Sequence, residues 1–117
     1  MSADRELLEL AAKANGFIDD AVDGSEAHGL HRDAEGLFYW VDANGWAPWV
    51  PADDDGQALR LAVKLRLEVA PGCYFPDQVE VYMHDRNPVA ELFGTDELAA
   101  TRRAIVRAAA EIGKAMP

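Results

Sequence analysis

Cysteine is almost absent from this chain of 117 residues: Cys73 is the only one, so no disulfide can form within the chain. A single cysteine is typical of a protein that stays in a reducing compartment. The chain also lacks any run of 18 apolar residues, and its first residues, MSADRELLEL, show no basic region followed by an apolar one. We therefore expect no signal peptide, no membrane span and a cytoplasmic protein.

The sequence motifs of common catalytic and nucleotide-binding sites are missing as well. The chain contains no GxGxxG, no Walker sequence and no Gly-x-Ser-x-Gly. Cys73 follows a Pro-Gly turn, and no histidine lies at a recognisable catalytic spacing from it. The sequence therefore predicts a protein that is not an enzyme and that needs no cofactor.

Basic residues are scarce, and the net charge is −10. The excess acid lies in the first half, where residues 1–58 hold 13 acids and 3 bases, whereas residues 59–117 hold 8 of each. An acidic surface repels nucleic-acid phosphates and attracts basic protein surfaces. We expect a protein partner with a basic surface and no direct contact with nucleic acid; alternatively, the acidity only keeps the protein in solution.

Apolar residues, by contrast, make up half of the chain, which is enough for the core of one domain spanning residues 1–117. Their periodicity predicts an α+β fold of order α-β-β-α-β-β-α, with a small antiparallel or mixed sheet sandwiched by helices. The predicted helices span 3–15, 53–67 and 95–116, and the predicted strands span 37–41, 46–50, 78–85 and 89–93. Residues 17–36 read as a loop or an irregular edge strand.

Several side chains are assigned to faces by the same periodicity. In the strand at 78–85, Val79, Val81 and Met83 should point inward, and Glu80 and Tyr82 outward.

The two later helices receive similar assignments. Leu61 should lie in a buried stripe widened by Leu59 and Val63. In the last helix, capped by Thr95, the inward residues should be Leu98, Ile105 and Ile112, and the outward ones Arg102, Arg103 and Arg107.

Two segments carry a family resemblance, WVPADDDGQALRLAVKL at 49–65 and TRRAIVRAAAEIGKAM at 101–116. They resemble small bacteriophage and prophage proteins described as carrying a phage α-β-α sandwich domain, and DRELLELAAKANG at 4–16 is similar to the opening helix of those proteins. The resemblance implies a compact sandwich fold and a phage origin, hence the bacterial host cytoplasm. It implies no catalytic residue.

Five residues are the candidates for partner binding. Asp19, Asp20 and Asp23 lie in the acidic segment that we expect to form a loop, where a basic surface could approach them. Trp46 and Trp49 belong to an aromatic cluster, and tryptophan commonly anchors protein interfaces. The alternative for the aromatic residues is that helices cover them as core.

Metal binding is the remaining chemical possibility. His28 and His31 form an HxxH pair near several aspartates, and two imidazoles with a carboxylate can bind zinc, but the pair lacks the i, i+4 spacing of helical sites. Asp53, Asp54 and Asp55 are explained by a helix start, where acids cap the helix and complement its dipole. No metal site is therefore predicted.

These observations favour a non-catalytic phage accessory protein that binds a protein partner, possible roles including a host-defence antagonist comparable to anti-CRISPR inhibitors. Two alternatives stay open: a structural or housekeeping phage protein, and a small metal-dependent enzyme that uses His28 and His31.

Overall fold

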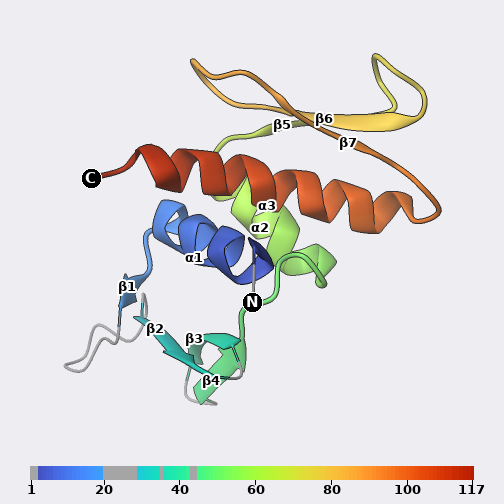
Figure 1. Cartoon of the computed structure of the whole chain (residues 1–117). Coiled ribbons are helices and arrows are strands. Elements are labelled where there is room, and N and C mark those ends of the chain that lie inside the picture. Colours follow the sequence, from blue (N-terminus) through green and yellow to red (C-terminus); the bar gives the residue numbers. More distant parts are fainter. Residues whose placement is uncertain (1–2, 20–28, 35, 43–44) are drawn as a thin grey trace.

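The computed structural model describes residues 3–19, 29–34, 36–42 and 45–117. Within these ranges three helices lie between a four-stranded and a three-stranded sheet (Figure 1). The helices are α1 (Ala3–Asn15), α2 (Asp55–Lys64) and α3 (Glu97–Ala115). The strands are β1 (Ile18–Asp19), β2 (Gly29–Asp33), β3 (Gly36–Asp42), β4 (Gly45–Pro48), β5 (Glu68–Pro71), β6 (Gln78–Tyr82) and β7 (Val89–Leu92).

The α+β class predicted from the sequence is confirmed, but the strands form two sheets instead of one between helices. The first sheet has the order β1-β2-β3-β4, with β1 parallel to β2 and the other pairs antiparallel. The second has the antiparallel order β5-β6-β7. Pro48 gives a physical reason for the separation, because a proline in β4 cannot donate to a further strand and marks the edge of the first sheet.

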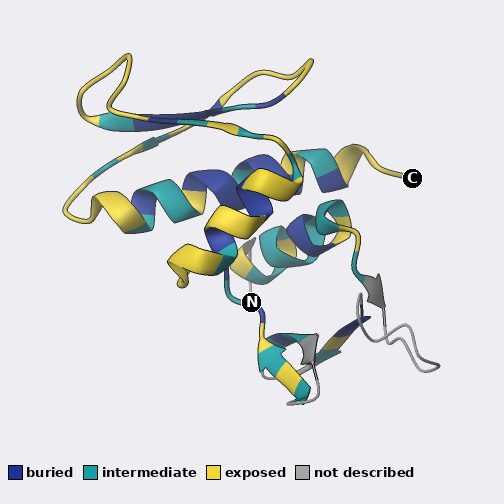
Figure 2. Cartoon of the chain, turned by 180° about the vertical axis from the view of Figure 1, so that it is seen from behind, coloured by how far each residue is buried: buried dark blue, intermediate teal, exposed yellow. Residues whose placement is uncertain are grey.

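Helices α1 and α3 make the closest packing in the molecule. Ala104, Ala108 and Ala109 of α3 are fully buried, and Figure 2 shows the buried residues concentrated on this helix and its neighbours. At Gly113 the two backbones nearly touch, since a Cβ atom there would lie 2.0 Å from the backbone oxygen of Leu10. Small side chains on α3 are thus what allows α1 to approach so closely. None of the described helices is both long and apolar enough to cross a bilayer.

Helix α2 begins where its three aspartates predicted. Asp54 is the N-cap, and its side chain accepts a hydrogen bond from the Gln57 backbone nitrogen at 2.8 Å. Leu61 is buried as expected, but Leu59 and Val63 are 64% and 68% exposed. The wider buried stripe predicted for this helix is wrong, because α2 packs along α3 on one side only (Figure 1).

Helix α3 starts one residue later than predicted, with Asp96 instead of Thr95 as the N-cap; its side chain accepts from the Ala99 backbone nitrogen at 3.0 Å. Ile105 is buried and Ile112 packs against the core, as predicted. Leu98 is exposed, contrary to expectation. The cause is length: α3 has 19 residues, against 13 in α1 and 10 in α2, and its burial starts only at Ala100.

The three arginines of α3 were predicted to point outward; Arg103 is exposed as predicted, Arg102 and Arg107 are partly buried, and all three have partners. Arg102 donates to the backbone oxygen of Ala52 at 2.9 Å and to Asp55 at 2.7 Å, which ties α3 to the start of α2. Arg103 and Arg107 both bond to Glu91 of β7. Arg103 and Arg107 therefore connect α3 to the second sheet. Together with Arg102, they link α3 to both α2 and β7.

Candidate functional site

Of the three acidic candidates for partner binding, only Asp19 is among the residues that the structure describes. Asp20, Asp23 and also His28 are outside the described residues. Asp19 ends β1, where its backbone is paired with Leu30. Whether these acids meet a partner stays a prediction.

The two candidate tryptophans have different environments. Trp49 is 5% exposed and packs edge-on against Phe17, with ring centroids 5.3 Å apart, so it is a core residue and the prediction of a partner-binding role for it is corrected. The strand turns inward after Pro48, where the Trp49 backbone nitrogen bonds to the Leu37 oxygen at 2.8 Å. Trp46 is 41% exposed on the edge strand β4, beside His31, and remains accessible.

The described residues include no group of three or more His, Cys, Asp or Glu side chains arranged to hold a metal ion. His31 lies among aromatic rings, 6.3 Å from Phe38 and 6.0 Å from Trp46 between ring centroids. Cys73 is exposed in the loop after β5, where its thiol lies 3.8 Å from the backbone oxygen of Pro71.

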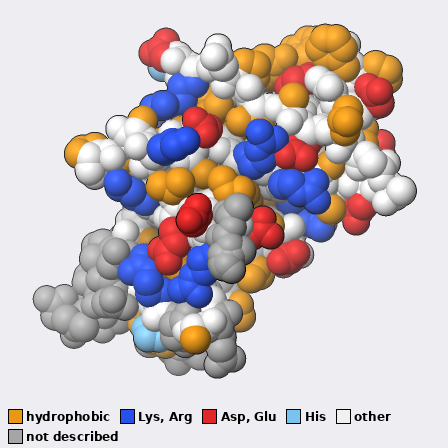
Figure 3. All heavy atoms as spheres, in the orientation of Figure 1, with side chains coloured by type: hydrophobic (Ala, Val, Ile, Leu, Met, Phe, Trp, Pro, Cys, Tyr) orange, Lys and Arg blue, Asp and Glu red, His pale blue; other side chains and the backbone are white. Residues whose placement is uncertain are grey.

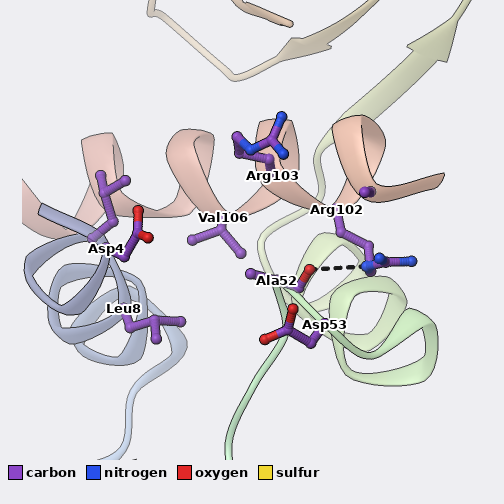
Figure 4. Close-up of a pocket in the computed structure, with 9 residues that line it drawn as sticks. Asp4, Leu8, Ala52, Asp53, Arg102, Arg103 and Val106 are labelled. Carbon is purple, nitrogen blue, oxygen red and sulfur yellow. Dashed lines mark hydrogen bonds between the residues drawn. The ribbon is translucent and has the colours of Figure 1, made fainter. Parts of the chain in front are cut away.

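A pocket of about 270 Å³ opens between α1, α3 and the turn before α2 (Figure 4). Two arginines and two aspartates line it, with no Ser, Thr, Cys or His. Arg102 is held by the backbone oxygen of Ala52, and Arg103 is paired with Glu91. Because Asp4 and Asp53 oppose an anion, the lining does not favour phosphate binding.

The second sheet, β5-β6-β7, has two faces with different side chains. Its face toward α3 carries the buried Val79, Val81 and Val89, together with Glu91, which reaches the α3 arginines. Side chains alternate along a strand, so the neighbouring positions point to the opposite face. On that opposite face, the strand register places Glu68 of β5 beside Tyr82 of β6. Glu80 of β6 lies between Ala70 of β5 and Ala90 of β7, and Gln78 lies beside Leu92.

Glu68, Glu80 and Tyr82 of this face form a cluster with Tyr74 of the loop between β5 and β6, which we name the tyrosine–glutamate cluster. The rings of Tyr74 and Tyr82 are perpendicular, at 88°, with centroids 5.9 Å apart. The Tyr74 hydroxyl lies 3.4 Å from a carboxylate oxygen of Glu68. The loop between β5 and β6 supplies Tyr74, so the cluster joins a loop to two strands.

Glu80 is the unusual member of the cluster. It lies on the face of the sheet that the alternation predicted, where we expected its side chain to be exposed to solvent. The side chain is instead buried, with 4% of its surface exposed. Its Oε2 accepts a hydrogen bond from the Gln78 side chain, and its Oε1 is buried with no hydrogen-bond partner among the described residues. A buried carboxylate oxygen without a donor is costly, which makes this position a candidate for a role other than stability.

The carboxylates also act on the two phenols. Glu68 is the largest cause that raises the pKa of Tyr74 above its ordinary value. For Tyr82 burial is the largest cause of a raised pKa, followed by Glu80. Both hydroxyls therefore stay protonated.

Exposed hydrophobic side chains adjoin the cluster. Tyr74, Phe75 and Leu92 are each more than half exposed. Figure 3 shows hydrophobic side chains gathered at the end of the molecule that this sheet forms, with acidic side chains among them. Carboxylates and aromatic faces beside apolar surface suit the binding of a cationic group of a protein.

No protein family, curated protein or solved structure matches this chain.

Proposed function

We propose that this protein is a non-catalytic phage accessory protein of the bacterial host cytoplasm that binds a protein partner through the partner's basic surface. The observation that carries the proposal is the tyrosine–glutamate cluster with its exposed apolar neighbours, on a sheet face turned away from α3. The net charge of −10 comes from residues 1–58, outside the second sheet, and it favours approach of the protein as a whole to basic surfaces over nucleic acid.

A host-defence nuclease or effector complex is a partner of this kind, because the surface on which such a protein holds nucleic acid is basic. An acidic protein that covers this surface competes directly with the nucleic acid. The proposed role is therefore antagonism of a host defence by occupation of a basic surface, without chemical change to the partner.

We expect the affinity for a partner captured from host lysate to fall steeply with salt. Electrostatic attraction is screened over about 10 Å at 0.1 M salt and over about 3 Å at 1 M. The measurement is the dissociation constant, and the association rate, across this range of sodium chloride. Association should slow the most, because charge steers the encounter of two proteins.

The control for this experiment is the same series with sucrose at matched osmolality, which leaves charge unscreened; the association rate, corrected for the viscosity of each sucrose solution, should stay largely unchanged. A dissociation constant that ignores sodium chloride would contradict the proposal. It would favour a housekeeping protein whose acidity serves solubility alone.

A further inference from the structure

We propose that the tyrosine–glutamate cluster is a receptor for one arginine side chain of the protein partner, whose guanidinium donates to the unpaired Oε1 of Glu80 and stacks on the tyrosine rings. This inference rests on the proposed function, and it assigns that function to one site and one chemical group.

The hydrogen-bonding state of Glu80 calls for a donor. Oε2 is already occupied by the Gln78 amide, while Oε1 is buried and has no donor among the described residues. Folded proteins satisfy the great majority of such atoms, with protein groups or ordered water. Oε1 is closed to solvent in the free protein, so a side chain of the partner must displace a covering side chain before it donates to Oε1 and removes this deficit.

The charge at the site calls for a cation. Glu68 reaches the Tyr74 hydroxyl at 3.4 Å and is the largest cause of the raised pKa of Tyr74, to which Glu80 adds a smaller contribution. Burial is the largest cause of the raised pKa of Tyr82, and Glu80 is the next. No described lysine or arginine forms an ion pair with Glu68 or Glu80, in contrast with Glu91 on the other face of the sheet, which binds two arginines. The sheet thus has one acidic residue neutralised toward α3, and two acids on its opposite face, Glu68 and the buried Glu80, that form no ion pair with a described lysine or arginine.

The tyrosine pair selects the form of the cation. The two rings pack edge to face at 88°, with their centroids 5.9 Å apart, so a flat cation would stack on the ring face that the pair leaves uncovered. A guanidinium is planar, carries five donors and is weakly hydrated, so it can stack on an aromatic face while it donates to carboxylates. A lysine ammonium is a compact, strongly hydrated charge that gains less from such a site.

Phe75 and Leu92 complete the site as an apolar border. Both are exposed in the free protein, and contact with a partner would cover them. Near-neutral contacts that exclude water around a central charged residue are the usual surroundings of an arginine hot spot in a protein interface.

The test is a titration of the whole protein, followed by NMR signals of the tyrosine rings, with a blocked pentapeptide that has one central arginine between serines and glycines. We expect the Tyr74 and Tyr82 signals to shift. The same peptide with citrulline, which has the shape of arginine without its charge, should leave them in place. The lysine peptide should bind at least about tenfold more weakly, a ratio that corresponds to about 1.4 kcal/mol.

Two variants locate the binding. Glu80→Gln removes the central charge with little change of shape and should weaken the arginine peptide at least about tenfold. Glu97→Gln makes the same change at an exposed position in the first turn of α3 and should bind as the unchanged protein does. Folding of each variant is verified from its amide spectrum before titration.

The outcomes separate this inference from the proposed function. Equal binding of the arginine and citrulline peptides, equal binding of arginine and lysine, or full binding by Glu80→Gln would each overturn the arginine site. A salt-sensitive partner that binds Glu80→Gln normally would keep the proposed function and reject the site. Arginine binding at the cluster, together with a partner that ignores salt, would keep the site and reject the proposed function.

Discussion

Replacement of Gly113 by alanine is expected to lower the free energy of unfolding by about 3 kcal/mol, the upper end of the usual range for an overfilled core. The added Cβ atom would lie 2.0 Å from the oxygen and 2.8 Å from the carbonyl carbon of Leu10, and both are backbone atoms. No side-chain rotation relieves such a contact, so α1 must move away from α3. The measurement is unfolding in urea, with the slope checked for two-state behaviour.

Gly56→Ala is the matched control for this substitution. A Cβ atom at position 56, in α2, would lie 3.4 Å from Asp54 Oδ2 and 3.6 Å from an Arg60 nitrogen, both in flexible side chains. Alanine is the better helix former by up to about 1 kcal/mol, so Gly56→Ala should be neutral or stabilising. If Gly113→Ala proved equally harmless, the close approach of α1 and α3 would be wrong.

Glu80→Met is expected to have the opposite sign and to raise the free energy of unfolding by about 1–3 kcal/mol. Glu80 is 4% exposed and its Oε1 has no partner among the described residues, so the native protein keeps a carboxylate away from water without full compensation. Methionine has a similar length and no polar atom to desolvate, and replacement of buried charged groups by apolar ones is often neutral or stabilising. Gln78 is partly exposed, so its freed amide can bond to water.

The control for this gain is Glu97→Met, the same exchange on the exposed first turn of α3. It removes an acid from the positive end of the helix dipole and should lower stability by a few tenths of a kcal/mol. Thermal and urea unfolding of both variants give the comparison. A loss of stability in Glu80→Met would mean that the carboxylate is structural, and it would remove the argument that the site is prepared for a partner.

Much of the fold could be predicted from local pattern. The aspartates at 53–55 mark the start of α2 because capping is a local interaction, and the alternation of Val79, Val81 and Met83 identifies the buried side of β6. The turn signal after residue 41 likewise predicts the hairpin of β3 and β4.

Long-range packing explains what local pattern could not predict. The pattern of apolar residues in α2 is the same whether other elements cover one side of the helix or two. The exposure of Leu59 and Val63 therefore depends on which elements pack against α2, and the sequence of the helix does not specify them. The core position of Trp49 likewise depends on contact with Phe17, more than 30 residues earlier in the chain.

The candidate site was the least predictable part of the molecule. Alternation places Glu80 and Tyr82 on one face, and this signal was in the sequence. The position of Tyr74 depends on the conformation of the loop between β5 and β6, and the strand pairing that brings Glu68 beside Tyr82 depends on β5, which was not predicted. The acidity of residues 1–58 instead directed attention to Asp19, Asp20 and Asp23.

The most direct test of the account is the affinity of the captured partner for Glu80→Met, measured beside the unchanged protein and Glu97→Met. We predict that Glu80→Met is the more stable protein and yet binds at least about tenfold more weakly, mainly through faster dissociation, because a buried charged contact holds the complex together. Glu97→Met should bind within about twofold of the unchanged protein. A stably folded Glu80→Met that binds the partner with unchanged affinity would contradict the claim that this sheet face is where the partner docks.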